Sequence, residues 1–273
     1  MTTLIAQVGD IDIAYRWDGR EDGPVLMMAH AMGTSHRIWD LQIEALAPSY
    51  RILRYDWRGH GDTDAPEGLY TLSQFEADAV GLMDALGLAR VNWVGISTGG
   101  MIGQGLAINY PRRIATLSLC NTTSQSNPWY HKWVAERQAV VRRDGMIPVW
   151  EMTKRLWFTD AFVEAASPAY NAVREVFVAT KVPGYFGGTS AVADLAFLEN
   201  LHQIKCPTGI IAAGADPVTP IEHAEAIRNR INGATLNVIE HQRHFSNVEV
   251  PAEFNSVLLR GLSEMVGSDS ERA

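Results

Sequence analysis

The chain has 273 residues, of which 47% are hydrophobic, and this is enough for one large core or for one domain with an insertion. Its formal net charge of −8 and the lack of a tract rich in lysine and arginine exclude nucleic acid and an anionic membrane as expected partners. The N-terminus lacks the features of a signal peptide, no uncharged apolar stretch is long enough to span a bilayer, and Cys120 and Cys206 are expected as reduced thiols, so we predict a soluble cytoplasmic protein.

Short apolar runs typical of strands alternate with longer amphipathic runs over the first 120 residues. Residues 1–17 predict two strands joined by a turn at Gly9 and Asp10. The runs that follow predict, in order, a strand at 25–29, a helix at 38–47, a strand at 51–56, a helix that begins at Ser73 as N-cap and ends near Gly87, a strand at 91–96, a helix that ends at Pro111 and a strand at 114–120. This alternation favours a parallel sheet with helices on both faces.

The pattern changes after residue 120, because residues 121–189 contain no clear strand and are rich in aromatic and basic residues. The alternation then resumes with strands at 208–214 and 235–240 and helices at 222–230 and 252–266, and the tail GSDSERA is expected to be disordered. We therefore predict an α/β protein with a mostly parallel, doubly wound sheet. Residues 1–120 and 190–273 form its core domain, and residues 121–189 form a helical cap.

Residues 94–104, VGISTGGMIGQ, place Ser97 between Gly95 and Gly99 where a predicted strand gives way to a predicted helix. The G-x-S-x-G pattern alone is weak evidence, because it also arises by chance. In this context it indicates a nucleophile elbow, in which a strained turn holds the serine and the glycines leave room for neighbouring backbone. The following helix also brings free N–H groups near the hydroxyl. The alternative is an ordinary strand-to-helix turn.

A serine hydroxyl needs a base, and the base needs an orienting acid. In proteins with this elbow the acid and then the base follow the serine along the chain. Asp216 lies just past a predicted strand, and His244 lies in the loop after the last predicted strand. We therefore predict Ser97, Asp216 and His244 as the catalytic residues.

Other residues compete for the roles of base and acid. His241 directly follows the last strand, whereas a base that reaches back over the sheet needs a loop, which favours His244. Asp194 and Glu199 are alternatives to Asp216 by residue type only, because their segment fits a solvated helix face.

The negative charge that develops on an attacked carbonyl needs two backbone donors. We predict the N–H of Thr98, directly after the serine, and the N–H of Met32, in the loop after the strand at 25–29. His30 in the same loop is expected to hydrogen-bond that loop. Asp62 and Asp64 lie in a glycine-rich loop with no third ligand, so they are expected to be solvated and no metal site is predicted.

The motifs HAMG, YDWRGHG, GISTGG, ADPVTP and HFSNVEVP occur in the order of the α/β-hydrolase family, which the chain resembles. Within that family it is most similar to the 3-oxoadipate enol-lactonases, on stretches that include MGTSHRIWDLQIEAL, GISTGGMIGQGLA, RLWFT and VPGYFGGTSAVADLAF. The resemblance covers nearly the whole chain. It implies Ser97 as nucleophile, Asp216 as acid and His244 as base, with oxyanion donors at Met32 and Thr98.

The chain departs from the lactonases at one position that bears on the substrate. Where they tend to carry an arginine that faces the pocket, this sequence has Gln125, and a neutral amide binds a carboxylate less well than a guanidinium does. Four arginines are candidate replacements, although each also fits a solvated helix face: Arg137, Arg142, Arg143 and Arg155. The aromatic residues expected to roof an apolar pocket are Trp129, Trp133, Trp157 and Phe158.

The sequence thus predicts a serine hydrolase that cleaves a lactone or a carboxylic ester through an acyl-enzyme, with no metal and no organic cofactor. The expected partner is a small-molecule ester or lactone, and assembly into a homo-oligomer is left open. The triad is also compatible with a broad-specificity carboxylesterase, a C–C bond hydrolase or a perhydrolase of the same fold. The alternative from another class is a ligand-binding protein of this fold with little turnover.

Overall fold

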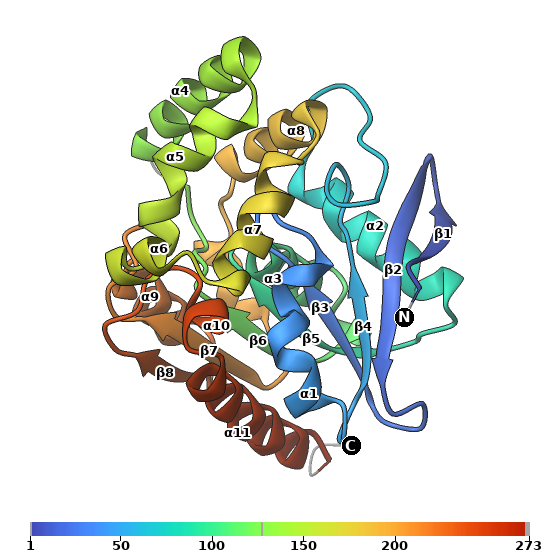
Figure 1. Ribbon diagram of the computed structural model, residues 1–273. Helices are drawn as coiled ribbons and strands as arrows, with labels where there is room; N and C mark the ends of the chain where they lie inside the picture. Colours follow the sequence, from blue (N-terminus) through green and yellow to red (C-terminus); the bar gives the residue numbers. More distant parts are fainter. Residues whose placement is uncertain (1, 127, 271–273) are drawn as a thin grey trace.

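The computed structural model describes residues 2–126 and 128–270, and its centre is an eight-stranded sheet with the strand order β1-β2-β4-β3-β5-β6-β7-β8 (Figure 1). The strands are β1 (Leu4–Val8), β2 (Ile11–Gly19), β3 (Val25–Ala29), β4 (Arg51–Tyr55), β5 (Val91–Ile96), β6 (Ile114–Cys120), β7 (Thr208–Ala213) and β8 (Thr235–Ile239). Every residue of β5 and β7 is buried, as expected for central strands that are covered on both faces.

Strand direction divides the sheet into a short antiparallel edge and a parallel body. β1 pairs antiparallel with β2, and β2 pairs antiparallel with β4, whereas all pairs from β4 to β8 are parallel. This confirms the prediction of a mostly parallel sheet. The carboxyl ends of the parallel strands meet at one edge, which is where α/β proteins place their ligand sites.

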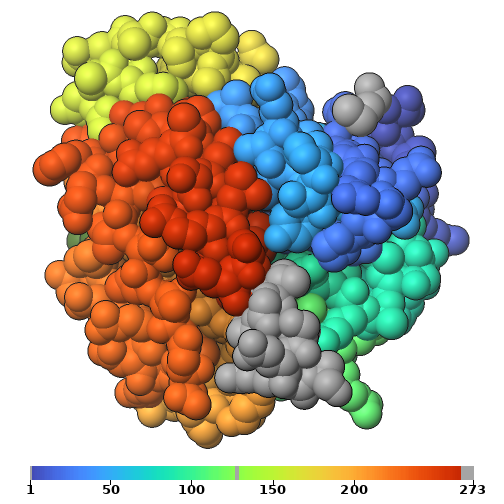
Figure 2. Space-filling model, turned by 90° about the horizontal axis from the view of Figure 1, so that it is seen from below, coloured from blue at the N-terminus to red at the C-terminus, as the bar shows by residue number. Residues whose placement is uncertain are grey.

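Helices cover both faces of the sheet. One face packs against α2 (Leu72–Ala85), α3 (Thr98–Asn109) and α9 (Ile221–Arg230), and the other against α1 (Ile43–Leu46) and α11 (Pro251–Ser270). Figure 2 shows α11 beside the segment of α1, and Asn255 of α11 donates a hydrogen bond to the Leu41 carbonyl at 2.9 Å. Short helices complete the core: η1 (His36–Gln42), η2 (Pro111–Arg113), η3 (Leu198–Gln203) and α10 (Ser246–Glu249).

Five helices between β6 and β7 form a layer over the carboxyl edge of the sheet (Figure 1). They are α4 (Pro128–Asp144), α5 (Met146–Trp157), α6 (Asp160–Ala165), α7 (Pro168–Val178) and α8 (Val182–Ala193), and we call them the cap. The boundary that the sequence suggested between residues 189 and 190 falls inside α8.

One end of the cap is held against the core by backbone contact. Gly184 of α8 packs on Gly59 so closely that a Cβ atom at Gly184 would lie 1.7 Å from the Gly59 carbonyl oxygen. Lys181, just before α8, donates to the Thr63 carbonyl at 2.8 Å. This close contact requires glycine at both positions. Gly59 is the first glycine of the segment RGHG, and Gly184 belongs to α8.

Three local predictions need correction. The N-cap of α2 is Thr71, not Ser73, because the Thr71 hydroxyl and the Gln74 side chain form a reciprocal capping box. The helix expected at 38–47 is a 3₁₀-helix, η1, followed by the single turn α1. The tail is helical through Ser270 as part of α11, and residues 271–273 lie outside the described part of the chain.

Candidate active site

Ser97 lies in the turn between β5 and α3 with a φ of 53° and a ψ of −116°. Residues with a side chain rarely adopt a positive φ, which costs on the order of 1–3 kcal/mol. Hydrogen bonds hold the turn in place, because the Ser97 N–H donates to the Cys120 carbonyl (2.9 Å) and the Thr122 hydroxyl donates to the Ser97 carbonyl (2.7 Å). With its backbone bound in this way, Ser97 presents its side chain to the cavity above the sheet.

The glycines on either side of Ser97 are required by close backbone approach. A Cβ atom at Gly95 would lie 2.1 Å from the Gly99 carbonyl oxygen, and one at Gly99 would lie 2.2 Å from the Ala29 carbonyl oxygen. The first contact allows the chain to turn sharply from strand to helix. The second brings the start of α3 against the end of β3, and so against the loop that contains Met32.

Asp216 and His244 are hydrogen-bonded to one another in the loops after β7 and β8. The Nδ1–H of His244 donates to Asp216 Oδ2 at 2.7 Å, and both side chains are buried. The same carboxylate accepts from the backbone N–H groups of Val218 (2.8 Å) and Thr219 (3.1 Å), from the Thr219 hydroxyl (2.6 Å) and from Asn121 Nδ2 (3.4 Å). These bonds fix the carboxylate and, through it, the orientation of the imidazole.

The charge state of Asp216 follows from these contacts. Burial by itself would raise the pKa of Asp216, but the charge and hydrogen bond of His244 and the hydrogen bonds of Thr219 outweigh it, and the pKa lies below its usual value. Asp216 is therefore an anion at neutral pH. An anion that accepts from Nδ1 keeps that nitrogen protonated and leaves Nε2 with a free lone pair.

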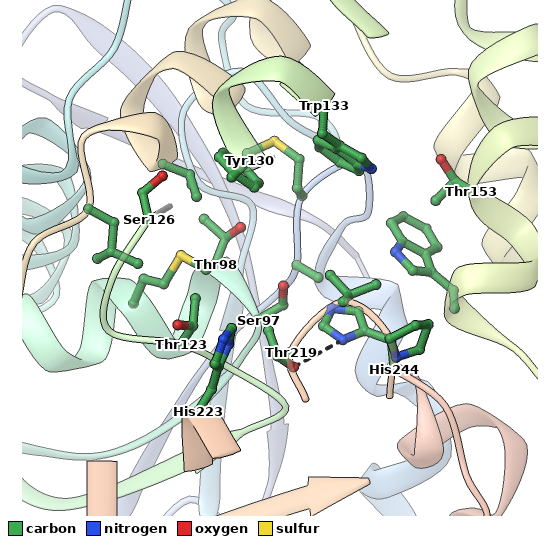
Figure 3. A pocket seen from close by; sticks show the side chains of 18 of the residues that line it. Ser97, Thr98, Thr123, Ser126, Tyr130, Trp133, Thr153, Thr219, His223 and His244 are labelled. Carbon is green, nitrogen blue, oxygen red and sulfur yellow. Dashed lines mark hydrogen bonds between the residues drawn. The ribbon is translucent and has the colours of Figure 1, made fainter. Parts of the chain in front are cut away.

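Ser97 and His244 line the same cavity of about 280 Å³. Figure 3 shows the Ser97 side chain beside the His244 ring, on the side of the ring away from Nδ1 and its Thr219 contact. The predicted serine, acid and base, which are far apart in the sequence, thus meet at the carboxyl edge of the sheet.

The loop of His244 is attached to the cap on both sides of the histidine. The Arg243 guanidinium donates to the Phe158 carbonyl at 2.9 Å, and the Phe245 N–H donates to the Trp157 carbonyl at 3.1 Å. His241, the alternative base, is exposed and has a φ of 61°. The alternative acids, Asp194 and Glu199, are also exposed.

Met32 and Thr98, the predicted oxyanion donors, both line the cavity. Thr98 is the first residue of α3, so its N–H has no acceptor within the helix. The loop of Met32 is ordered by its neighbours, because the Gly33 N–H donates to His60 Nε2 at 2.9 Å and the Thr34 N–H donates to the Ala31 carbonyl at 3.2 Å.

Two buried histidines, His30 and His60, hold the loop of Met32 in place. His30 Nδ1 lies 2.8 Å from the Ala31 carbonyl, its Nε2 accepts from the Trp57 N–H at 3.2 Å, and its ring stacks on Trp57, in agreement with the predicted loop-bonding role. Burial lowers the pKa of His30 to about 4 and that of His60 well below its usual value. Both rings are therefore neutral at pH 7.

The cavity has one aromatic wall and one polar wall. Its aromatic wall comes from the cap and contains Trp129, Tyr130, Trp133, Trp157, Phe177 and Tyr185. Its polar wall contains Thr123, Gln125, Ser126 and His223. The predicted pocket residues Gln125, Trp133 and Trp157 all line the cavity, whereas Phe158 is fully buried among Phe162, Tyr170 and Phe245.

The four arginines considered as substitutes for the residue at position 125 differ in their surroundings. Arg142, Arg143 and Arg155 are exposed. Arg137 is buried, its guanidinium lies 3.7 Å from the centre of the Trp133 ring, and its Nη2 donates to the Met152 carbonyl. Among the described residues that line the cavity, no arginine is present.

His223 is one of several cavity residues that the sequence did not predict. It lies in the first turn of α9, and its imidazole points into the cavity near Ser97 (Figure 3). The sequence feature that could have indicated His223 is its position in the first turn of the helix that follows Asp216. The rotation of that turn, which decides whether a side chain faces the cavity, is set by the packing of α9.

Comparison with known proteins identifies the family of the chain. The model of the alpha/beta hydrolase fold matches residues 24–251. A 3-oxoadipate enol-lactonase of Acinetobacter baylyi is 32% identical over 93% of both chains. A hydrolase from Pseudomonas aeruginosa superimposes with a TM-score of 0.91, at 37% identity over 95% of this chain and 98% of its own.

The enol-lactonase from Burkholderia xenovorans superimposes equally well, with a TM-score of 0.91 and 31% identity over 95% of this chain and all of its own. The matched residues 24–251 include β3 to β8, the cap and the loops that carry Ser97, Asp216 and His244. The chain belongs to the α/β hydrolase fold family.

Proposed function

We propose that this chain is a serine hydrolase that opens a lactone or a carboxylic ester of a small molecule through an acyl-enzyme. The proposal rests on one observation: a serine in a strained turn shares a cavity with a histidine whose Nδ1 is bonded to a buried carboxylate at 2.7 Å. This arrangement activates a hydroxyl that is otherwise a poor nucleophile at neutral pH.

In the first half of the reaction, His244 Nε2 takes the proton of Ser97 as its Oγ attacks the substrate carbonyl. The N–H groups of Met32 and Thr98 stabilise the oxyanion, and each such donor is worth about 2.7–4 kcal/mol of barrier. The tetrahedral intermediate collapses as the C–O bond breaks, and His244 returns the proton to the leaving oxygen. Asp216 remains ionised and holds the imidazole in one tautomer.

In the second half, His244 removes a proton from water, which attacks the acyl-enzyme. The acid product leaves, and Ser97 regains its proton. When the leaving group is an enol, it converts to a ketone, and this conversion prevents the ring from closing again. No step requires a metal or an organic cofactor.

The proposed substrate class is an enol-lactone that carries a carboxylate. Two relatives are named as enol-lactonases, one of them for 3-oxoadipate. That acid has two carboxyl groups, and formation of a lactone uses one and leaves the other free. The cavity of about 280 Å³ suits a substrate of this size, with an aromatic wall for its carbon skeleton and a polar wall for its oxygen atoms.

Ser97→Ala tests the nucleophile. We expect kcat for p-nitrophenyl acetate and for an enol-lactone to fall by at least about three orders of magnitude, because the acyl-enzyme cannot form. The melting temperature should stay within a few degrees of the wild type. Ser49→Ala, at an exposed serine, is the matched control and should retain full activity.

Two results would contradict the proposal. Wild-type turnover in Ser97→Ala would remove Ser97 from the reaction. Binding of one equivalent of ligand by the wild type, with neither a burst nor steady turnover, would favour a binding protein of this fold.

A further inference from the structure

His223 has a nitrogen that the fold leaves without a partner. Its Nδ1 is enclosed by protein atoms, so Nε2 is the nitrogen that a ligand in the cavity can reach, and neither nitrogen makes a hydrogen bond to a described residue. An accessible imidazole nitrogen without a protein partner can hydrogen-bond a ligand in the cavity.

The position of His223 relative to the reacting groups is specific. In Figure 3 its ring and the His244 ring lie on opposite sides of Ser97. It also lies where the catalytic cavity meets a neighbouring cavity of about 310 Å³, and the two cavities share Thr123, Gln125, Ser126 and His223. Nε2 of His223 is therefore part of the polar wall of the cavity that also contains Ser97.

We propose that His223 is a specificity-determining residue whose imidazole hydrogen-bonds the free carboxylate of an acidic lactone while Ser97 attacks the ring carbonyl. The inference rests on the proposed function and assigns the binding of the carboxylate to a residue of the polar wall. Gln125, in the same wall, offers a second donor to the carboxylate. The aromatic wall contacts the carbon atoms of the ring.

The electrostatic surroundings of His223 allow an anion to bind. Burial lowers the pKa of His223, and the charges of Asp216 and Glu222 oppose this effect only in part. The neutral ring offers one N–H, and a bound carboxylate raises the pKa of the ring and so strengthens the contact.

The other titratable groups around the cavity do not repel an anion. The charge of Asp216 is directed to His244, and burial raises the pKa of the Tyr130 and Tyr185 hydroxyls, so they remain neutral. The buried guanidinium of Arg137, behind the Trp133 ring, adds positive potential on the cap side.

The test compares two substrates that share one ring. One is an enol-lactone with a carboxymethyl arm, and the other has a methyl group in place of that arm. In His223→Phe we expect KM for the acidic lactone to rise about tenfold to a hundredfold, as for loss of a hydrogen bond to a charged group. KM for the methyl lactone should change less than about threefold, and kcat should change little for either.

His223→Gln places an amide nitrogen near the position of Nε2 and should recover part of the affinity for the acidic lactone. His202→Phe changes an exposed histidine of η3 in the same way and should leave both KM values unchanged. An equal rise in KM for both lactones would assign His223 a purely structural role. No change in either KM would remove it from the site.

A binding measurement separates this inference from the proposed function. Calorimetry in a Ser97→Ala background measures Kd for adipate, with adipamide as the uncharged reference, and needs no turnover. Weaker binding of adipate alone in His223→Phe supports the inference even if the lactones are poor substrates. Unchanged adipate binding overturns it, even if ester hydrolysis proceeds as proposed.

Discussion

Close backbone contacts of Gly99 fix the geometry of the turn that contains Ser97. Gly99 lies against the carbonyl oxygens of Ala29 and His30, so the turn of Ser97 and the loop of Met32 touch through their backbones. A side chain at position 99 has no flexible neighbour to displace, because the atoms that it would meet belong to the backbone. Catalytic geometry and local stability are therefore coupled at this residue.

Gly99→Ala should separate these two segments. We expect kcat for p-nitrophenyl acetate to fall by about 10²–10³, as for loss of one oxyanion donor, and the free energy of unfolding to fall by about 1–3 kcal/mol. Steady-state kinetics and urea unfolding measure the two effects. Gly209→Ala in β7 is the control, because its Cβ atom would meet ordinary contacts at 3.4 Å or more. Wild-type kcat in Gly99→Ala would refute the coupling.

At the scale of single residues, the sequence predicted those site residues whose motifs follow one another in a fixed order along the chain. Ser97, Asp216 and His244 could be predicted because each role needs a particular residue type and the three roles follow one another in a fixed order along the chain. The hydrogen bond between Asp216 and His244 agrees with that interpretation. The roles of Met32 and Thr98 remain predictions. His223 and Phe177 could not be named, because the direction of a side chain on a helix depends on how that helix packs.

At the scale of elements, tertiary contacts change local preferences. Residues 38–47 have helical spacing, yet the structure there is a 3₁₀-helix followed by one α-helical turn. The carbonyls of Ile38 and Leu41 accept hydrogen bonds from Asn247 and Asn255, which lie more than 200 residues away. Partners so distant cannot be read from a local pattern.

The contact between Gly184 and Gly59 leads to a prediction about α8. Gly184→Ala forces α8 away from the core, so we expect the free energy of unfolding to fall by about 1–3 kcal/mol. KM should also change, because the next residue, Tyr185, lines the cavity. Gly261→Ala in α11 should instead stabilise by about 0.5–1 kcal/mol, since its Cβ atom would meet nothing within 4 Å. Equal effects of the two changes in urea unfolding would contradict the packing argument.

At the scale of the whole molecule, the alternation of strands and helices predicted the parallel sheet and its two covered faces. The cap was predicted as helical, but its packing was not, because five amphipathic helices can be arranged in many ways. Arg137 illustrates this: its sequence fits a solvated face, but the packing of α5 on α4 buries the side chain, and its Nη2 donates to the Met152 carbonyl of α5.

The buried neutral histidines make the stability of the molecule depend on pH. The pKa of His30 is about 4 in the folded chain, whereas an unfolded chain binds the proton near pH 6.5. Between these values the unfolded state holds more protons, so stability is complete above pH 6.5 and falls as the pH drops to 4. The difference corresponds to about 3 kcal/mol for His30, and His60 acts in the same direction.

Urea unfolding between pH 7.5 and pH 4 measures this loss. His30→Asn removes the titrating group and should reduce the slope of stability against pH, whatever its effect on stability at pH 7. His202→Asn, at an exposed histidine, should leave the slope as in the wild type. An unchanged slope in His30→Asn would show that other groups cause the acid sensitivity.

The contact of Gly184 with Gly59 also restricts how a ligand reaches Ser97. The cap is bonded to the core there and, through Trp157 and Phe158, to the loop of His244, and another margin of the cap is formed by the start of α4. Trp129 lies at that margin, where 55% of its surface is exposed although it also borders the cavity. We therefore expect a ligand to enter beside Trp129, and changes in α4 to alter the rate of entry while the chemistry of the proposed triad stays the same.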